Sequence, residues 1–117
     1  MEHTVSLKQN HAFRRLYAKG KSAALPCLVL YSRKNRLGVN RLGFTTGVKL
    51  GKAVVRNRVR RRLREVYRTN EGRILPGFDL VVVARSRAVN ARYGDLERQF
   101  LKAADKLGLL LPREARP

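Results

Sequence analysis

The segment from Lys49 to Tyr67, KLGKAVVRNRVRRRLREVY, holds a dense set of side chains that can bind phosphate. Its cations are Lys49, Lys52, Arg56, Arg58, Arg60, Arg61, Arg62 and Arg64, and its only acid is Glu65. Like charges three or four residues apart, such as Arg56 and Arg60, cost an isolated helix about 0.2 to 0.5 kcal/mol per pair. A polyanion removes this repulsion, because its phosphates neutralise the cations and accept hydrogen bonds from free N–H groups at the helix N-terminus. The segment therefore predicts a helix that binds nucleic acid.

The charge of the whole chain favours the same kind of partner. Among its 117 residues are 27 Lys and Arg but only 8 Asp and Glu, so the formal net charge is +19. Such a cation binds phosphate backbones by releasing their counterions, and a membrane surface is the weaker alternative. Apolar residues make up 44% of the chain, which is enough for a core. We therefore expect a single domain over residues 1–117, with an ordered core at about 7–110 and frayed termini.

Acids and nucleophiles do not form a pattern that suits protein-based catalysis. The acids are scattered, at Glu2, Glu65, Glu71, Asp79, Asp95, Glu97, Asp105 and Glu114. No pair of them is spaced to hold two metal ions, and no histidine, serine and cysteine constellation accompanies them. Cys27 is the only cysteine, which excludes a disulfide framework and a zinc site within the chain. We therefore expect neither catalytic residues nor metal ligands in the protein.

Periodicity along the chain predicts the elements that must position the basic helix. Helices are predicted at roughly 8–19, 52–70 and 91–107, and strands at 25–33, 41–48 and 78–86, with a short further strand at 22–24. The last long strand, FDLVVVARS, is nearly all apolar, so we place it at the centre of the sheet. This order predicts an α+β fold, a two-layer α/β sandwich in which helices pack on one sheet.

The basic helix also carries an apolar stripe that can hold it on the sheet. Val55, Val59, Leu63, Val66 and Tyr67 fall within about 120° of the helical wheel. Burying each side chain gains about 1.5 to 3 kcal/mol, which outweighs the summed repulsion between the cations. Arg58 and Arg61 point away from this stripe, and Arg56 lies at its edge. The cationic surface is therefore expected to extend from open solvent to the cleft between helix and sheet.

The basic helix and its flanks resemble a known family. The pattern of Lys49, Gly51, Lys52, Ala53, Val54, Arg56, Asn57, Arg58, Arg60, Arg61, Arg64 and Glu65 is similar to the RNR signature of the bacterial ribonuclease P protein subunit. The likeness continues in HAFRRLYAKGKS, LVLYSR, RLGFTTG and GFDLVVVAR, and so covers the chain from Leu7 to Leu107. Two positions depart from the pattern: Val48 stands where many members have a lysine, and Arg62 where the residue is often apolar.

This resemblance implies a role in tRNA maturation. The protein would bind the catalytic RNA of ribonuclease P and the 5′ leader of precursor tRNA, and would assist endonucleolytic removal of that leader. Catalysis would belong to the RNA, with Mg²⁺ bound mainly by RNA phosphates. The protein would be a monomer within a cytoplasmic ribonucleoprotein, with no membrane contact. The implied fold is αβββαβα, with a four-stranded sheet and a left-handed βαβ crossover, although general rules favour the right hand.

The resemblance also assigns residues to two RNA-binding surfaces. Contacts with the catalytic RNA are expected from Lys49, Gly51, Lys52, Arg56, Asn57, Arg58, Arg60, Arg61 and Arg64. A cleft for the single-stranded leader is expected to consist of Phe13, Tyr17, Val29, Tyr31 and Arg56. Aromatic faces stack on unpaired bases of any sequence, which suits a variable leader. The alternative is that these aromatic residues belong to the core, and Gly51 could serve either a turn or close approach to a phosphate.

Two other classes of nucleic-acid-binding protein share the basic helix. A ribosomal or other structural RNA-binding protein would show similar charge but would need no cleft for a single strand. A DNA-binding regulator is a weaker alternative, because this helix is more evenly basic than the reading of base edges requires. The opening residues, MEHTVSLKQN, lack the pattern of a signal peptide, so we expect a soluble intracellular protein.

Overall fold

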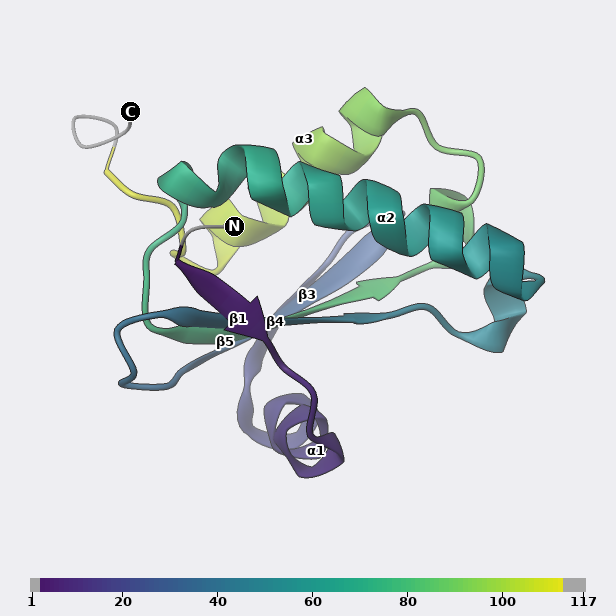
Figure 1. Cartoon of the computed structure of the whole chain (residues 1–117). Coiled ribbons are helices and arrows are strands. Elements are labelled where there is room, and N and C mark those ends of the chain that lie inside the picture. The colour runs from purple at the N-terminus through teal and green to yellow at the C-terminus, as the bar shows by residue number, and fades with distance from the viewer. Residues whose placement is uncertain (1–2, 113–117) are drawn as a thin grey trace.

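A mixed five-stranded sheet forms the centre of the structure, a computed structural model that describes residues 3–112 (Figure 1). The strands are β1 (Thr4–Ser6), β2 (Lys21–Ala24), β3 (Leu28–Lys34), β4 (Asn40–Thr45) and β5 (Phe78–Ala84). The helices are α1 (Asn10–Lys19), α2 (Ala53–Asn70) and α3 (Tyr93–Lys106), with short 3₁₀ turns η1 (Val48–Leu50), η2 (Glu71–Arg73) and η3 (Ser86–Ala88). The strand order is β1-β4-β5-β3-β2, in which β1, β4 and β5 run parallel and β3 pairs antiparallel with both β5 and β2.

Strand β5 lies at the centre of the sheet, as its apolar run predicts. Leu80 and Val82 face α2 and α3, whereas Val81 faces α1, and each of the three is at most 1% exposed. A strand that is buried on both faces has no solvated side and therefore shows no polar alternation. The parallel connection from β4 to β5 passes through α2, so the basic helix belongs to a βαβ crossover, whose left hand stays a prediction.

The α+β class is confirmed, but two details of the predicted fold differ. The sheet has five strands rather than four, because Thr4–Ser6 pairs parallel with β4 ahead of the region expected to be ordered. Helices also cover both faces of the sheet: α2 and α3 pack on one face, and α1 packs alone on the other (Figure 1). The segment TVS is too short and too polar to show strand periodicity, and a helix stripe does not specify which face it covers.

Strand β1 is held by a polar cluster around the fully buried Tyr67. The Thr4 hydroxyl lies 2.7 Å from Tyr67 Oη, and the buried Asn40 donates to the same oxygen at 3.1 Å. Asn40 also accepts a hydrogen bond from the Phe78 backbone N–H at 2.9 Å. Burial raises the pKa of the Tyr67 hydroxyl, so this group stays neutral. The cluster links β1, β4 and β5 to α2 and fixes the helix on the sheet edge.

We expect Tyr67→Phe to lower the free energy of unfolding by about 1 to 3 kcal/mol, because Asn40 would lose a buried hydrogen-bond acceptor. Chemical denaturation of the free protein would measure this loss. Tyr93→Phe is the matched control, since its hydroxyl makes only an exposed contact of 3.4 Å with Thr69. Equal stability of Tyr67→Phe and Tyr93→Phe would contradict a structural role for the buried hydroxyl.

Candidate nucleic-acid interface

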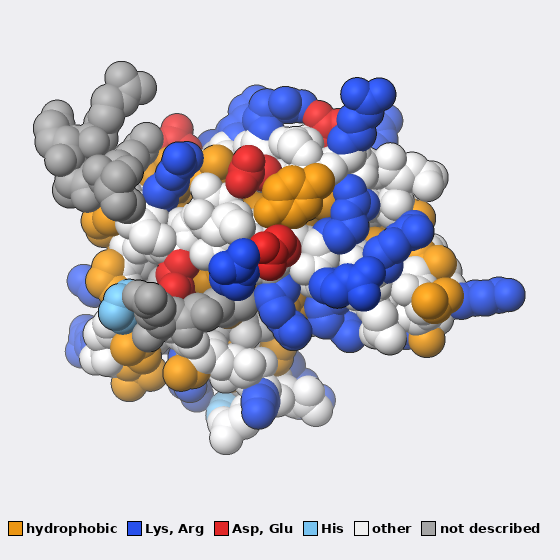
Figure 2. Space-filling model, turned by 45° about the horizontal axis from the view of Figure 1, so that its top comes forward, with side chains coloured by type: hydrophobic (Ala, Val, Ile, Leu, Met, Phe, Trp, Pro, Cys, Tyr) orange, Lys and Arg blue, Asp and Glu red, His pale blue; other side chains and the backbone are white. Residues whose placement is uncertain are grey.

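The segment from η1 to Arg64 of α2 presents a continuous cationic surface. Side chains of Lys49, Lys52, Asn57, Arg58, Arg61 and Arg64 are exposed, and those of Arg56, Arg60 and Arg62 are half-buried. The predicted stripe is confirmed, because Val59, Leu63 and Val66 are at most 2% exposed against the sheet. Lys and Arg side chains gather on the right of Figure 2, where this segment lies, and acidic side chains are sparse there. Sequence periodicity thus places these cations away from the buried stripe of α2.

The arginines of this surface have no carboxylate partner within residues 3–112. The only acid of α2, Glu65, is bound by Arg68, whose hydrogen bond lowers the pKa of the Glu65 carboxyl. The other described ion pairs join Arg41 to Asp79 and Arg98 to Asp95, away from α2. The positive charge of the helix therefore remains available to a polyanion.

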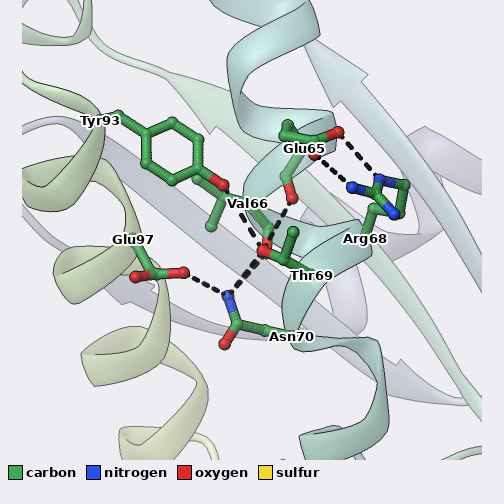
Figure 3. Close-up of polar contacts among 7 residues, drawn as sticks. All are labelled: Glu65, Val66, Arg68, Thr69, Asn70, Tyr93 and Glu97. Atoms are coloured by element: carbon green, nitrogen blue, oxygen red, sulfur yellow. Dashed lines mark hydrogen bonds and ion pairs between the residues drawn. The ribbon is translucent and has the colours of Figure 1, made fainter.

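The C-terminal end of α2 is tied to α3 instead (Figure 3). Asn70 Nδ2 donates to the Val66 carbonyl at 2.8 Å and to Glu97 Oε2 at 2.9 Å. The Thr69 hydroxyl donates to the Glu65 carbonyl at 3.0 Å. These contacts satisfy polar groups within the protein, so the surface open to a ligand is the segment between Lys49 and Arg64.

Arg60 and Arg64 turn from the helix towards the edge of the sheet. Arg60 Nη2 donates to Thr46 Oγ1 at 2.6 Å, and the Arg64 guanidinium lies 5.8 Å from the centre of the Phe44 ring. Together with Phe13 they line a cavity of about 220 Å³ at this edge. A guanidinium stacked on an aromatic ring keeps its N–H groups free for phosphate. The cavity can therefore receive both a phosphate and an apolar base face.

The aromatic residues predicted for the leader cleft lie together on the opposite face of the sheet. The rings of Tyr17 and Tyr31 meet edge to face at 4.9 Å, and Phe13 and Tyr17 are 6.4 Å apart. Tyr17 is 40% exposed, whereas Phe13, Val29 and Tyr31 are half-buried. Tyr17 therefore offers the most accessible ring, and Phe13 and Tyr31 serve partly as its packing support.

An open strand edge connects the two surfaces. Strand β1 pairs only with Asn40–Leu42, so Gly43–Thr45 pair with β5 on one side but have no neighbouring strand on the other. Tyr17 Oη lies 2.8 Å from Thr45 Oγ1 on one side of this edge, and Arg60 holds Thr46 on the other. The structure thus brings the aromatic and cationic groups to one edge, which sequence spacing alone does not show.

Arg56 differs from its predicted place in the leader cleft. It lies on α2, which covers the other face of the sheet, and it does not line the cavity that contains Phe13. Its Nε is buried and has no hydrogen-bond partner among the described residues. Residues that sequence reasoning missed are Phe44, Thr45 and Thr46. Strand alternation in RLGFTTGV could have revealed them, because it places Thr45 with the aromatic face and Phe44 with the arginines.

Two glycines have definite structural roles at the interface. Gly51 has φ 130°, a conformation that L side chains rarely adopt, so the turn before α2 by itself requires glycine. A Cβ on Gly43 would lie 2.5 Å from Phe13 Cζ, so the ring rests directly on the β4 backbone. The absence of a side chain at Gly43 therefore allows Phe13 to pack directly on β4.

We expect Gly43→Ala to displace Phe13 and to lower the free energy of unfolding by about 1 to 3 kcal/mol, because the added methyl group overpacks the site. Denaturant titration would measure the effect. Gly47→Ala, in the turn that follows β4, is the control, since a Cβ there meets nothing within 4 Å. If the two variants were equally stable, the close approach of Phe13 to the strand would not constrain the fold.

The structure explains one departure from the RNR pattern. Arg62 is half-buried beside the apolar stripe, and its Nη2 donates to the Ala91 carbonyl at 2.6 Å. This bond satisfies part of the guanidinium and ties α2 to the segment before α3. Val48, in contrast, is 77% exposed. No internal contact in the structure explains its replacement of lysine.

A basic α+β domain with an arginine-rich crossover helix on one face of its sheet and a group of aromatic side chains on the other indicates an RNA-binding protein. Residues 1–108 match the family model Ribonuclease P. A ribonuclease P protein component from Natranaerobius thermophilus is 44% identical over 94% of this chain and 96% of its own length. Another, from Alkaliphilus oremlandii, is 40% identical over 89% of this chain and 91% of its own length.

Solved structures agree with this relationship. The ribonuclease P protein of Staphylococcus aureus superposes with a TM-score of 0.82 at 30% identity, and the alignment covers 91% of this chain and 97% of that one. The protein from Thermotoga maritima gives a TM-score of 0.77 at 32% identity, with 83% of this chain and 92% of that one covered. The chain belongs to the ribonuclease P protein family. It is accordingly a protein component of ribonuclease P, the endoribonuclease that matures the 5′ end of tRNA.

Within the described residues, no group of three or more His, Cys, Asp and Glu side chains could hold a metal ion. No helix between residues 3 and 112 is long and apolar enough to cross a bilayer.

Proposed function

We propose that the exposed cations of α2 bind the catalytic RNA of ribonuclease P, and that the aromatic cleft beside α1 binds the 5′ leader of precursor tRNA. The observation that carries the proposal is the cavity at the open edge of β4, where Arg60 and Arg64 meet Phe13. A single strand that crosses this edge would place its phosphates on guanidinium groups and its bases on aromatic rings. Duplex RNA, which exposes few base faces, would gain nothing from the rings.

In this proposal the protein supplies charge and position rather than reacting groups. Arg58 and Arg61 are exposed and lack acidic partners among the described residues, so they neutralise RNA phosphates at little cost in desolvation. Mg²⁺ ions are ligated mainly by RNA phosphates, and the catalytic step belongs to the RNA. One copy of the protein acts in each ribonucleoprotein particle.

Reconstitution tests the proposal directly. The protein is mixed with a bacterial ribonuclease P RNA and a precursor tRNA at low Mg²⁺, and cleavage at the 5′ end is measured. We expect accurate maturation that neither component gives alone. The double variant Arg58→Ala, Arg61→Ala should lose this stimulation, whereas Lys102→Ala, an exposed cation on α3, should retain it. Stimulation that survives the double variant would contradict the assigned surface.

A structural RNA-binding role is the second candidate. Such a protein would stabilise the folded catalytic RNA without touching the leader. The rings that remain accessible beside the open β4 edge favour leader binding, because a purely structural protein gains nothing from a 40% exposed Tyr17. Equal affinity of the reconstituted particle for precursor and mature tRNA would favour the structural role instead.

A further inference from the structure

A second basic hollow lies on the α1 face of the sheet, on the far side of α1 from Tyr17. It is lined by Arg15, Arg33, Lys34, Asn35, Arg36, Arg41 and Asp79 and has a volume of about 440 Å³. A smaller hollow of about 120 Å³ adjoins it and shares Arg15, Arg33, Arg41 and Asp79. Helix α1 packs on Val81 through Leu16 and thereby separates this basic hollow from the aromatic cleft. We call these two adjoining basic hollows together the distal hollow.

Strand alternation explains the position of the distal hollow. Arg41, Asp79 and Arg33 form one cross-strand row on β4, β5 and β3. The next row on the same face contains Gly43 and Val81, which α1 covers. Charged residues therefore emerge on one side of α1, while Thr45 emerges on the other, beside Tyr17.

The single acid of the distal hollow is already occupied. Arg41 Nε and Nη2 donate to the two Asp79 oxygens at 2.7 Å and 2.6 Å, and Asn35 Nδ2 adds a bond of 3.0 Å. Burial raises the pKa of Asp79, but the hydrogen bonds from Arg41 and Asn35, with the charges of Arg41 and Arg33, lower it by more. Asp79 is thus ionised and paired. The remaining cations have no carboxylate partner within residues 3–112: Arg15, Arg33, Lys34 and Arg36.

Backbone strain marks Arg36 in particular. Its φ is 62°, and among residues 3–112 it is the one non-glycine with positive φ. The left-handed conformation costs an L residue about 1 to 2 kcal/mol, so glycine or asparagine is the usual choice. The loop holds this geometry through Asn35, whose Oδ1 accepts from the Leu37 N–H at 2.8 Å and whose Nδ2 donates to the Val39 carbonyl at 3.1 Å. Strain of this kind concentrates at functional positions. Arginine here places a guanidinium at the rim of the distal hollow.

We propose that the distal hollow binds phosphodiester groups of the upstream part of the leader, beyond the nucleotides held in the aromatic cleft. This inference rests on the proposed leader-binding function. Both sites occupy the same sheet face, and only α1, about 10 to 12 Å across, lies between them. No Phe, Tyr or Trp side chain lines the distal hollow, and its cations outnumber its one imidazole, that of His11, so we expect it to bind the RNA backbone rather than the bases. Guanidinium groups bind phosphate through paired hydrogen bonds, and Arg33 and Arg36 are free to do so.

The experiment compares three RNAs in the reconstituted holoenzyme: mature tRNA, a precursor with a short leader that fills only the aromatic cleft, and a precursor with a long leader. The variant is Arg33→Ala combined with Arg36→Gly, which removes two cations and relieves the strain at position 36. Lys102→Ala is the charge control on α3. Affinity of each RNA is measured over a range of salt concentrations.

We expect the variant to lose affinity for the long leader on the order of tenfold. The slope of log affinity against log salt for that RNA should fall by about 1.4 units, because each of the two lost contacts contributes about 0.7 on a single strand. Binding of the short leader and of the catalytic RNA should stay unchanged. An equal loss for both leaders, a loss of catalytic-RNA affinity, or no loss at all would overturn the inference. A wild-type particle without preference for the short leader over mature tRNA would instead overturn the proposed function itself.

Discussion

Affinity of the protein for the catalytic RNA should fall by about 10³ to 10⁵ between 50 and 200 mM monovalent salt, because roughly six or more phosphate contacts release that many counterions. The expected contacts lie between Lys49 and Arg64, on η1 and the first two thirds of α2, where the described structure shows no competing carboxylate. A logarithmic plot of affinity against salt gives the number of contacts from its slope. A slope below about two would contradict a phosphate-binding role for this helix.

Single alanine substitutions show which arginines contribute to that salt slope. Arg58→Ala and Arg61→Ala should each lower it by about one unit and weaken binding evenly across RNA sequences. Both side chains are exposed, so the free protein should unfold at the same denaturant concentration as before. Arg98→Ala, on the solvent side of α3, is the matched control. Unchanged slopes in both α2 variants would remove these arginines from the interface.

Local sequence patterns predict the elements of this fold well, since each depends on neighbouring residues. The apolar stripe from Val59 to Val66 predicts the buried side of α2, and the run in β5 predicts its central place. Helix ends differ by at most two residues: the predicted 8–19, 52–70 and 91–107 are observed as Asn10–Lys19, Ala53–Asn70 and Tyr93–Lys106. Such ends depend on capping contacts that periodicity does not encode.

Longer-range features could not be predicted from the sequence. Strand β1 forms because Thr4 reaches the buried Tyr67, a contact between residues far apart in the chain. The face that α1 covers depends on the chain's path after β1, and this path separates Arg56 from the aromatic cleft. The cavity at the β4 edge arises where β1 ends at Ser6. Site residues on one element are therefore predictable, whereas the junction between elements requires the structure.

Tyr17→Leu should weaken binding of a leader-bearing precursor tRNA to the reconstituted enzyme by roughly 5- to 150-fold, which corresponds to about 1 to 3 kcal/mol for one stacked base. Tyr17 is 40% exposed, so its ring is accessible to a base, and leucine keeps much of its apolar volume. Mature tRNA has no leader, and its affinity should barely change. Equilibrium binding of both RNAs to the same enzyme preparation would measure the difference.

Tyr17→Phe separates the ring from its hydroxyl. This variant loses the 2.8 Å contact with Thr45 but keeps the stacking face, so its effect on leader affinity should be much smaller than that of leucine. The loss of leader affinity in Tyr31→Leu should lie between the losses in Tyr17→Leu and Tyr17→Phe. Tyr31 is half-buried and supports the Tyr17 ring edge to face at 4.9 Å. If folded Tyr17→Leu and Tyr31→Leu proteins kept the original preference for precursor over mature tRNA, the rings would be packing residues, and the leader would have to bind elsewhere on the protein.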